Sequence, residues 1–201
     1  MSGINATIAS MGSFQRVVLF LDFDGVLHPY RDGPGTHQLV NEKIKGLSAN
    51  CFSCLGRFEQ WLHRHPSVEV VFSTSWRLYV PVTELRSYFS PELRQRLKAC
   101  TPPLLNSRRR KEVLQVVQDE IEADPAVRFL VLEDASWQFD PDEFLSVNSA
   151  TPAWGRPGNS PYVYLTDQQT GLTDQDIKNL EYLMSMGSTI GGVTGEGDAQ
   201  G

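Results

Sequence analysis

Four short apolar runs recur along the chain, and segments with helical periodicity lie between them. The runs are Arg16–Leu21, Val68–Phe72, Arg128–Leu132 and Tyr162–Leu165. The first three are nearly continuous and rich in β-branched or aromatic residues, which is typical of strands covered on both faces. We therefore predict that these runs form strands of one sheet.

The intervening segments predict helices. Apolar positions with helical spacing occur in Cys51–Arg64, which ends before Pro66, and in Glu112–Ile121, whose apolar face is Val113, Val116, Val117 and Ile121. A third helix is predicted after the last strand, through Leu183, with Thr173 as N-cap and Asp176 as its acidic partner. Strands that alternate with helices predict an α/β fold with a central parallel sheet and right-handed crossovers.

Glycine and proline mark the irregular segments. They interrupt any period at residues 31–38 and 149–161, so both segments are predicted to be loops. Residues 1–15 and the Gly-rich residues 187–201 are expected to be flexible ends of a single domain over residues 16–186.

Composition and charge are those of an ordinary globular protein. Hydrophobic residues make up 40% of the chain and charged residues 21%, which argues against general disorder. The net charge of -6 gives no general attraction for a nucleic-acid backbone, so only a local basic patch could supply one. No apolar run approaches the roughly 20 residues of a membrane-spanning helix, and the N-terminal segment does not resemble a secretory signal. We expect a cytoplasmic protein that does not act at a membrane.

Three cysteines, an odd number, argue against a disulfide framework. Cys51 and Cys54 form a C-x-x-C, and His63 and His65 follow, so a zinc site is one interpretation. The alternative, which we favour, is that Cys54 is a small core residue at the buried face of an amphipathic helix.

Acidic and hydroxyl side chains follow three of the predicted strands. Asp22 and Asp24 come after the first strand, a Ser-Thr-Ser run at residues 73–75 after the second, and Glu133 with Asp134 after the third. Ligands of open parallel sheets bind at the carboxyl ends of the strands, so these groups are expected to converge. Carboxylate oxygens suit a hard cation such as magnesium. Taken alone, the D-x-D-G could also be a turn that closes a strand.

These segments resemble motifs of the haloacid dehalogenase superfamily. The resemblance lies in Phe20–Leu27 (FLDFDGVL) for the first motif, Ser73–Arg77 (STSWR) for the second and Leu132–Asp134 (LED) for the fourth. With the later Thr170–Thr173 (TGLT), the chain is most similar to the phosphatase-like domain of bacterial RNA-repair polyproteins. The resemblance spans residues 16–186 and implies a Rossmann-like three-layer sandwich without a large cap domain. The third motif is poorly defined.

The resemblance implies a magnesium-dependent phosphatase. Asp22 would attack phosphorus and form an aspartyl phosphate, and Asp24 would exchange protons with the leaving group and with water. Asp22, the backbone carbonyl of Asp24 and Asp134 would bind the metal. Glu133 stands where aspartate is more usual, and its extra methylene could move it off the metal or leave it bound through water.

The same resemblance implies groups that bind the phosphoryl oxygens. Thr74 would donate a hydrogen bond, with Ser73 and Ser75 as alternatives at the same motif. Lys111 fits the third-motif cation best. Its neighbours, which include Arg110, compete for that role, and a solvated basic helix start is the alternative for the whole run at residues 108–111. Arg77 and Arg110 are further candidates to bind substrate.

Substrate access is expected to be open. About fifty residues separate Asp24 from Thr74, and the first crossover needs most of them. Trp76, Arg77, Trp137 and the basic run lie near the predicted mouth, where aromatic and arginine side chains can stack bases and hold phosphates. Each also fits an ordinary surface or packing role. The expected partner is a phosphorylated substrate, either a small molecule or a nucleic-acid end.

Two other functions remain open at this point. One is a catalytically silent binding domain, although such a domain has no chemical need of both Asp22 and Asp24. The other is phosphoryl transfer to an acceptor other than water. The sequence does not encode the natural substrate, the partner proteins or the oligomeric state.

Overall fold

The computed structural model describes residues 16–30, 37–40, 43–47, 50–104, 107–124, 127–140 and 162–186. The predicted flexible ends, residues 1–15 and 187–201, and the predicted loop at 149–161 lie outside these ranges. In the described part of the chain, no helix has the length and apolar character needed to cross a bilayer.

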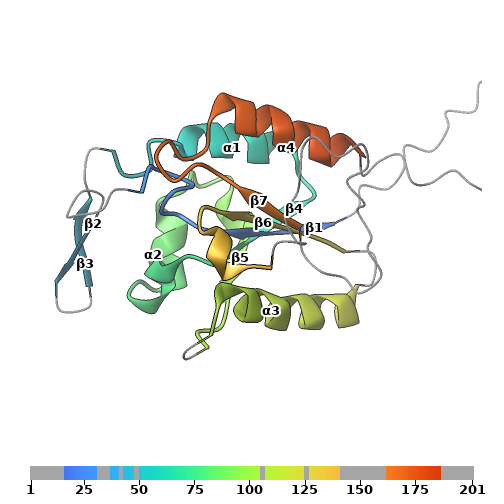
Figure 1. Cartoon of the computed structure of the whole chain (residues 1–201), viewed down its shortest axis with the longest axis horizontal. Coiled ribbons are helices and arrows are strands. Elements are labelled where there is room, and N and C mark those ends of the chain that lie inside the picture. Colours follow the sequence, from blue (N-terminus) through green and yellow to red (C-terminus); the bar gives the residue numbers. More distant parts are fainter. Residues whose placement is uncertain are drawn as a thin grey trace, which may run out of the picture.

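A five-stranded parallel sheet forms the centre of the fold (Figure 1). Its strands are β1 (Val17–Leu21), β4 (Val68–Phe72), β5 (Leu97–Cys100), β6 (Arg128–Glu133) and β7 (Tyr162–Leu165), in the spatial order β5-β4-β1-β6-β7. Every neighbouring pair is parallel. All four predicted strands are therefore confirmed, each to within one residue at either end.

Helices cover both faces of the sheet, as Figure 1 shows: α1 (Leu55–Arg64) and α4 (Asp174–Met186) lie on one face and α3 (Arg109–Ala123) on the other. Alternate residues of β1 enter different cores for this reason. Leu19 and Leu21 pack in the cluster of Trp61 and Leu180, whereas Phe20 packs in the cluster of Val113. This double burial explains the nearly continuous apolar runs, and the predicted Rossmann-like three-layer fold is confirmed.

The helix starts follow local chemistry. Thr173 and Asp176 form the predicted capping box of α4, because Thr173 N donates to Asp176 Oδ2 at 2.7 Å and Asp176 N donates to Thr173 Oγ1 at 3.2 Å. Helix α1 begins later than predicted, at Leu55 rather than Cys51, and Cys54 is its N-cap. Cys54 is buried in the core, in agreement with the interpretation that we favoured over a zinc site.

Four helices and strands were not predicted: β2 (His37–Val40), β3 (Lys43–Leu47), the short helix α2 (Val82–Ser87) and the edge strand β5. Strands β2 and β3 form an antiparallel pair after β1, so the predicted loop at 31–38 is wrong for His37 and Gln38. Strand β5 carries no apolar run, because two of its four residues are exposed. Among the described residues between Asp24 and β4, only the hairpin and α1 are regular elements, and there is no cap domain.

The order of the strands places a switch point at β1. The chain passes from β1 to β4 and β5 on one side, then returns through α3 to β6 and β7 on the other. Helices α1 and α3, which make these two connections, lie on opposite faces of the sheet. Such a point leaves a crevice at the carboxyl ends of the strands, and here that is the end of β1.

Candidate active site

Backbone hydrogen bonds extend the sheet by one residue beyond several strand ends. Ser73 N donates to Leu21 O at 2.9 Å, and Asp22 N donates to Leu132 O at 3.1 Å. The residues that follow β4, β1 and β6 are therefore held side by side. Because side chains alternate along a strand, Asp22, Ser73 and Glu133 fall on the face covered by α3.

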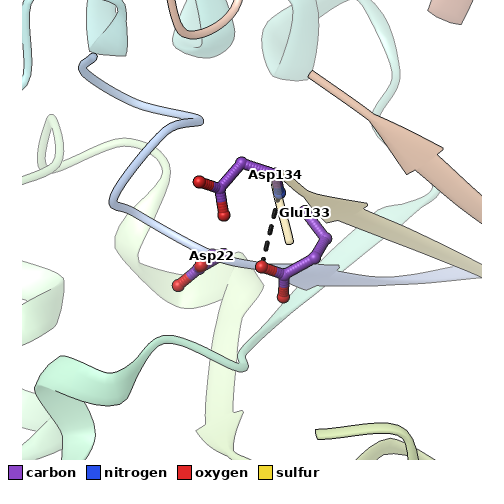
Figure 2. A group of neighbouring side chains, drawn as sticks. All are labelled: Asp22, Glu133 and Asp134. Atoms are coloured by element: carbon purple, nitrogen blue, oxygen red, sulfur yellow. Dashed lines mark hydrogen bonds between the residues drawn. The ribbon is translucent and has the colours of Figure 1, made fainter. Parts of the chain in front are cut away.

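Three carboxylates meet at this edge. One oxygen each of Asp22, Glu133 and Asp134 lies within 4.8 Å of the others, and Figure 2 shows the three side chains gathered where β1 and β6 end. In the described part of the chain, this is the only group of three or more such side chains that could hold a metal. The predicted convergence of two motifs far apart in the sequence is thus present in the fold.

A glycine makes the close approach of Asp134 possible. Gly25 has a φ of 71°, in the left-handed region that glycine adopts without strain, and the Asp134 carboxylate packs against its backbone. On the other side, Thr166 Oγ1 donates to Gly25 O at 2.7 Å. The turn after Asp24 is therefore enclosed between the ends of β6 and β7.

The T-G-L-T segment holds the same turn. Leu172 N donates to Val26 O at 2.8 Å, and Gly171, with a φ of 64°, lies against the backbone of Val26 and His28. The Thr170–Thr173 segment, which resembles a family motif, thus holds the first motif in place through backbone contacts.

Arg109 supplies the positive charge of the site. Its Nη1 lies 2.9 Å from Asp22 Oδ1 and 3.0 Å from Glu133 Oε2, and its side chain is largely buried. Burial opposes the charge, but Asp22 and Glu133 outweigh that effect and raise the pKa of the guanidinium. Arg109 is a permanent cation between two of the three carboxylates.

Lys111, predicted as this cation, is exposed. Helix α3 begins at Arg109, and a helix turns about 100° per residue, so Lys111 faces away from the side that carries Arg109, Glu112 and Val113. The predicted apolar face of α3, extended back by one turn from Val113, contains Arg109. The helical spacing in the sequence could therefore have identified Arg109 as a residue that faces the sheet. Arg110, predicted to bind substrate, forms an ion pair with Asp140 at 3.1 Å.

The acidic cluster has the electrostatic character of a cation site. Burial and the nearby charge of Asp22 raise the pKa of Glu133 well above its ordinary value, and they raise the pKa of Asp134 as well. Asp22 Oδ1 is buried and receives no hydrogen bond from the described residues, because Arg109 approaches it at ion-pair distance but not with hydrogen-bond geometry. A buried oxygen in this state, among other carboxylates, suits a hard divalent ion.

Glu133 is already bound by protein groups through both oxygens. Oε2 accepts from Arg109, and Oε1 accepts from the backbone N–H groups of Asp134 and Ala135, each at 3.3 Å. The dashed line in Figure 2 marks the bond from Asp134. Glu133 thus orients both Arg109 and the turn that carries Asp134.

The carboxylate of Asp24 is held by two other side chains. Its Oδ1 lies 3.0 Å from His28 Nε2, and its Oδ2 accepts from Trp76 Nε1 at 2.8 Å. Both partners are buried. The sequence placed Trp76 near the mouth as a residue that could stack a base, and the structure instead buries it as a donor to Asp24. No sequence signal indicated a role for His28.

The three hydroxyls of the second motif differ in environment. Ser73 Oγ is buried and has no hydrogen-bond partner in the described residues. Thr74 is buried too, but its Oγ1 caps the 3₁₀ turn η1 (Ser75–Leu78) by accepting from Trp76 N at 3.3 Å. Ser75 is exposed.

Arg77, predicted to bind substrate, braces the scaffold. Its guanidinium donates to the carbonyls of Thr101 at 3.1 Å and Thr74 at 2.6 Å and pairs with the buried Glu112 of α3. The side chain is only 6% exposed. It ties the ends of β4 and β5 to the start of α3, the helix that carries Arg109.

Comparison with known proteins agrees with this geometry. No curated protein and no solved structure matches the chain. A model of one protein family, described as the HAD domain in Swiss Army Knife RNA repair proteins, matches residues 18–177. These residues run from β1 into α4 and include Asp22, Asp24, Glu133 and Asp134. The chain therefore belongs to the family of HAD domains found in Swiss Army Knife RNA repair proteins.

Proposed function

We propose that this protein is a magnesium-dependent phosphomonoester hydrolase that acts through an aspartyl phosphate on Asp22. The observation that supports it best is the convergence of Asp22, Glu133 and Asp134, within 4.8 Å, beside the buried guanidinium of Arg109. Family membership supports the same reaction class.

The donor set fits a magnesium ion. Three carboxylates face one guanidinium, which leaves an excess of negative charge that a divalent cation would balance. Asp22 and Asp134 would bind the ion directly, with the backbone carbonyl of Asp24, and Glu133 would act through Arg109 or a water molecule because both of its oxygens are engaged. When bound, the ion would neutralise charge that develops on the phosphoryl oxygens.

Two displacements make up the reaction. In the first, a carboxylate oxygen of Asp22 bonds to phosphorus, the bond to the leaving oxygen breaks, and Asp24 gives its proton to that oxygen. In the second, water attacks the aspartyl phosphate, Asp24 takes a proton from the water, and the Asp22 carboxylate is regenerated with inorganic phosphate.

Ser73 and Arg109 are the residues that we assign to the transferring phosphoryl group. Ser73 follows β4 on the same side of the sheet as Asp22, and its buried hydroxyl has no partner among the described residues. Thr74, first choice from the sequence, already caps η1. We assign this role to Arg109 rather than Lys111 because Arg109 reaches Asp22. In the reaction, its guanidinium would also interact with the phosphoryl oxygens.

The substrate class that we propose is a phosphorylated nucleic-acid end. The description of the matched family refers to RNA repair proteins. Trp137, three residues beyond Asp134 in the 3₁₀ turn η3 (Ser136–Gln138), is 67% exposed, and no cap domain lies among the described residues that follow Asp24. An exposed indole near an open site can stack on a base.

Release of phosphate tests the proposal. The purified protein is incubated with an aryl phosphate and with 5′- and 3′-phosphorylated oligonucleotides, with magnesium or with a chelator. We expect magnesium-dependent release that Asp22→Asn abolishes. Metal binding without release from any phosphomonoester would favour a silent binding domain, and phosphate that appears on an added alcohol or nucleotide rather than in solution would favour a phosphotransferase.

A further inference from the structure

The carboxylate of Asp24 has a donor on each oxygen, and the two donors come from different parts of the chain. His28 lies in the turn after β1, four residues from Asp24, whereas Trp76 lies in η1 after β4. The two contacts fix both the position of the carboxyl group and the rotation of its plane. A carboxylate held only for solubility or charge needs no such pair of contacts.

Both donors are locked by packing. His28 is 0% exposed and Trp76 is 1% exposed. The ring of Phe52 lies 5.6 Å from that of His28 and 5.5 Å from that of Trp76, in edge contact with each. Phe23, the residue between the two aspartates, also packs on Trp76, at 5.5 Å. Because close packing fixes the positions of these rings, the two donors also fix the position of the Asp24 carboxyl group.

The surroundings of His28 determine which of its nitrogens carries the proton. Nδ1 is buried without a hydrogen-bond partner among the described residues, whereas Nε2 faces Asp24. A proton on Nδ1 would leave a buried N–H unpaired and would turn a lone pair of Nε2 towards a carboxylate, and both cost free energy. The neutral ring therefore keeps its proton on Nε2 and donates to Asp24.

We propose that His28 and Trp76 are positioning residues that aim the carboxyl group of Asp24 at the oxygen that gains or loses a proton in each displacement. The inference rests on the function proposed above. A donor that holds a carboxylate oxygen through one lone pair does not by itself prevent that oxygen from carrying a proton, because each oxygen has two lone-pair sites. The Asp24 side chain is 13% exposed, so it is not completely enclosed by its partners.

Proton donation matters most when the leaving group is poor. An alkoxide needs a proton as it departs, whereas a nitrophenolate departs without one. The value of kcat/KM reports the steps up to formation of the aspartyl phosphate. If the Asp24 carboxyl group is no longer correctly positioned, kcat/KM should therefore fall much more for alkyl phosphates than for p-nitrophenyl phosphate. A general loss of packing would lower both to the same extent.

Trp76→Phe tests the indole donor, since it removes Nε1 and keeps an aromatic ring. We expect kcat/KM to fall about ten-fold or more for an alkyl phosphate and less than about three-fold for p-nitrophenyl phosphate, within the range of proton-transfer catalysis. Trp61→Phe is the matched control, because Trp61 is equally buried but its Nε1 has no hydrogen-bond partner in the described residues. In the control, the ratio of the kcat/KM values for the two substrates should equal that of the wild type.

His28 is tested by a pair of variants. His28→Leu removes the donor, and His28→Gln places an amide N–H near the position of Nε2. We expect the leucine variant to lose activity towards the alkyl phosphate and the glutamine variant to recover at least part of it. With p-nitrophenyl phosphate, the leucine variant should release a burst of nitrophenol followed by slow turnover, because Asp24 also activates the water that hydrolyses the aspartyl phosphate.

The outcomes separate the two proposals. Suppose that Asp22→Asn abolishes phosphate release, while the His28 and Trp76 variants lower kcat/KM equally for both substrates. The positioning role is then wrong, but the proposed hydrolase activity is supported. Equal rates for Trp76→Phe and Trp61→Phe would overturn the positioning role in the same way. If Asp22→Asn retains full activity, the proposed reaction itself is wrong. Circular dichroism and thermal unfolding of each variant identify any change that comes from loss of the fold.

Discussion

Gly25 and Asp134 lie so close that a Cβ atom at position 25 would fall 2.3 Å from Asp134 Oδ2. The first and fourth motifs therefore interlock through a residue with no side chain. The D-x-D-G pattern is explained by this contact as well as by the turn, since the glycine leaves room for a carboxylate from another strand.

Gly25→Ala should disrupt the proposed metal site. The methyl group would displace Asp134, and the φ of 71° disfavours alanine. We expect kcat/KM to fall about 100-fold, as a shift of about 1 Å in a catalytic group can produce. Magnesium titration followed by thermal unfolding should show weaker binding. Gly56→Ala in α1 is the control, because nothing lies within 4 Å of its Cβ position; it should leave activity unchanged and stabilise the helix by about 0.5–1 kcal/mol.

Arg109 and Lys111 offer a direct test of the cation. Arg109→Ala should lower kcat/KM by roughly 100-fold or more, the cost of one lost electrostatic donor in other active sites. Lys111→Ala, which removes an exposed charge from the same helix turn, should change it by less than about two-fold, because exposed charges interact weakly. Steady-state kinetics at fixed magnesium measure both. A larger effect at Lys111 than at Arg109 would restore the assignment first made from the sequence.

Glu181 should contribute to the way in which stability changes with pH. It joins α4 to α1 through Arg64 and His65, each at 2.7 Å. Burial opposes ionisation, but these two hydrogen bonds outweigh it and lower the pKa of Glu181 below its ordinary 4.5. The carboxylate thus stabilises the fold above that pH, and the contribution is lost as the pH falls through the lowered pKa.

Glu181→Gln should therefore lower the free energy of unfolding at about pH 7 by up to roughly 1 kcal/mol, since Glu181 is partly exposed. The difference from the wild type should shrink as the pH is lowered towards 3. Urea unfolding at several pH values measures it. Glu92→Gln removes an exposed carboxylate elsewhere and serves as the charge control. A difference that grows as the pH falls would contradict the assignment.

Trp137 should distinguish a nucleic-acid end from a small substrate. Trp137→Ala is expected to raise KM about ten-fold or more for a phosphorylated oligonucleotide, because stacking on a base contributes about 1–3 kcal/mol. Activity on p-nitrophenyl phosphate should not change. Tyr182→Ala, an exposed aromatic residue of α4, is the control for general surface effects. Equal KM values for wild type and Trp137→Ala would remove Trp137 from the substrate site.

Local sequence determined the sheet and the residues that follow it. Four of the five strands were predictable because burial on both faces gives them nearly continuous apolar runs, of which Val17–Leu21 is the clearest. The position of Asp22 and Asp134 at strand ends, and their convergence at one edge, follow from the parallel arrangement. The edge strand β5 and the β2–β3 hairpin lack such runs, and for that reason they were not predicted.

Only the tertiary structure decided which neighbours serve Asp22 and Asp24. The apolar face of α3 puts Arg109, and not Lys111, on the side of Val113, but only the packing of this helix against the sheet brings the Arg109 guanidinium to Asp22. His28 and Trp76 meet at Asp24 through the folding of two turns 48 positions apart in the sequence. Apolar periodicity specifies which face of an element is buried, but contacts between separate turns depend on how the packed core brings them together.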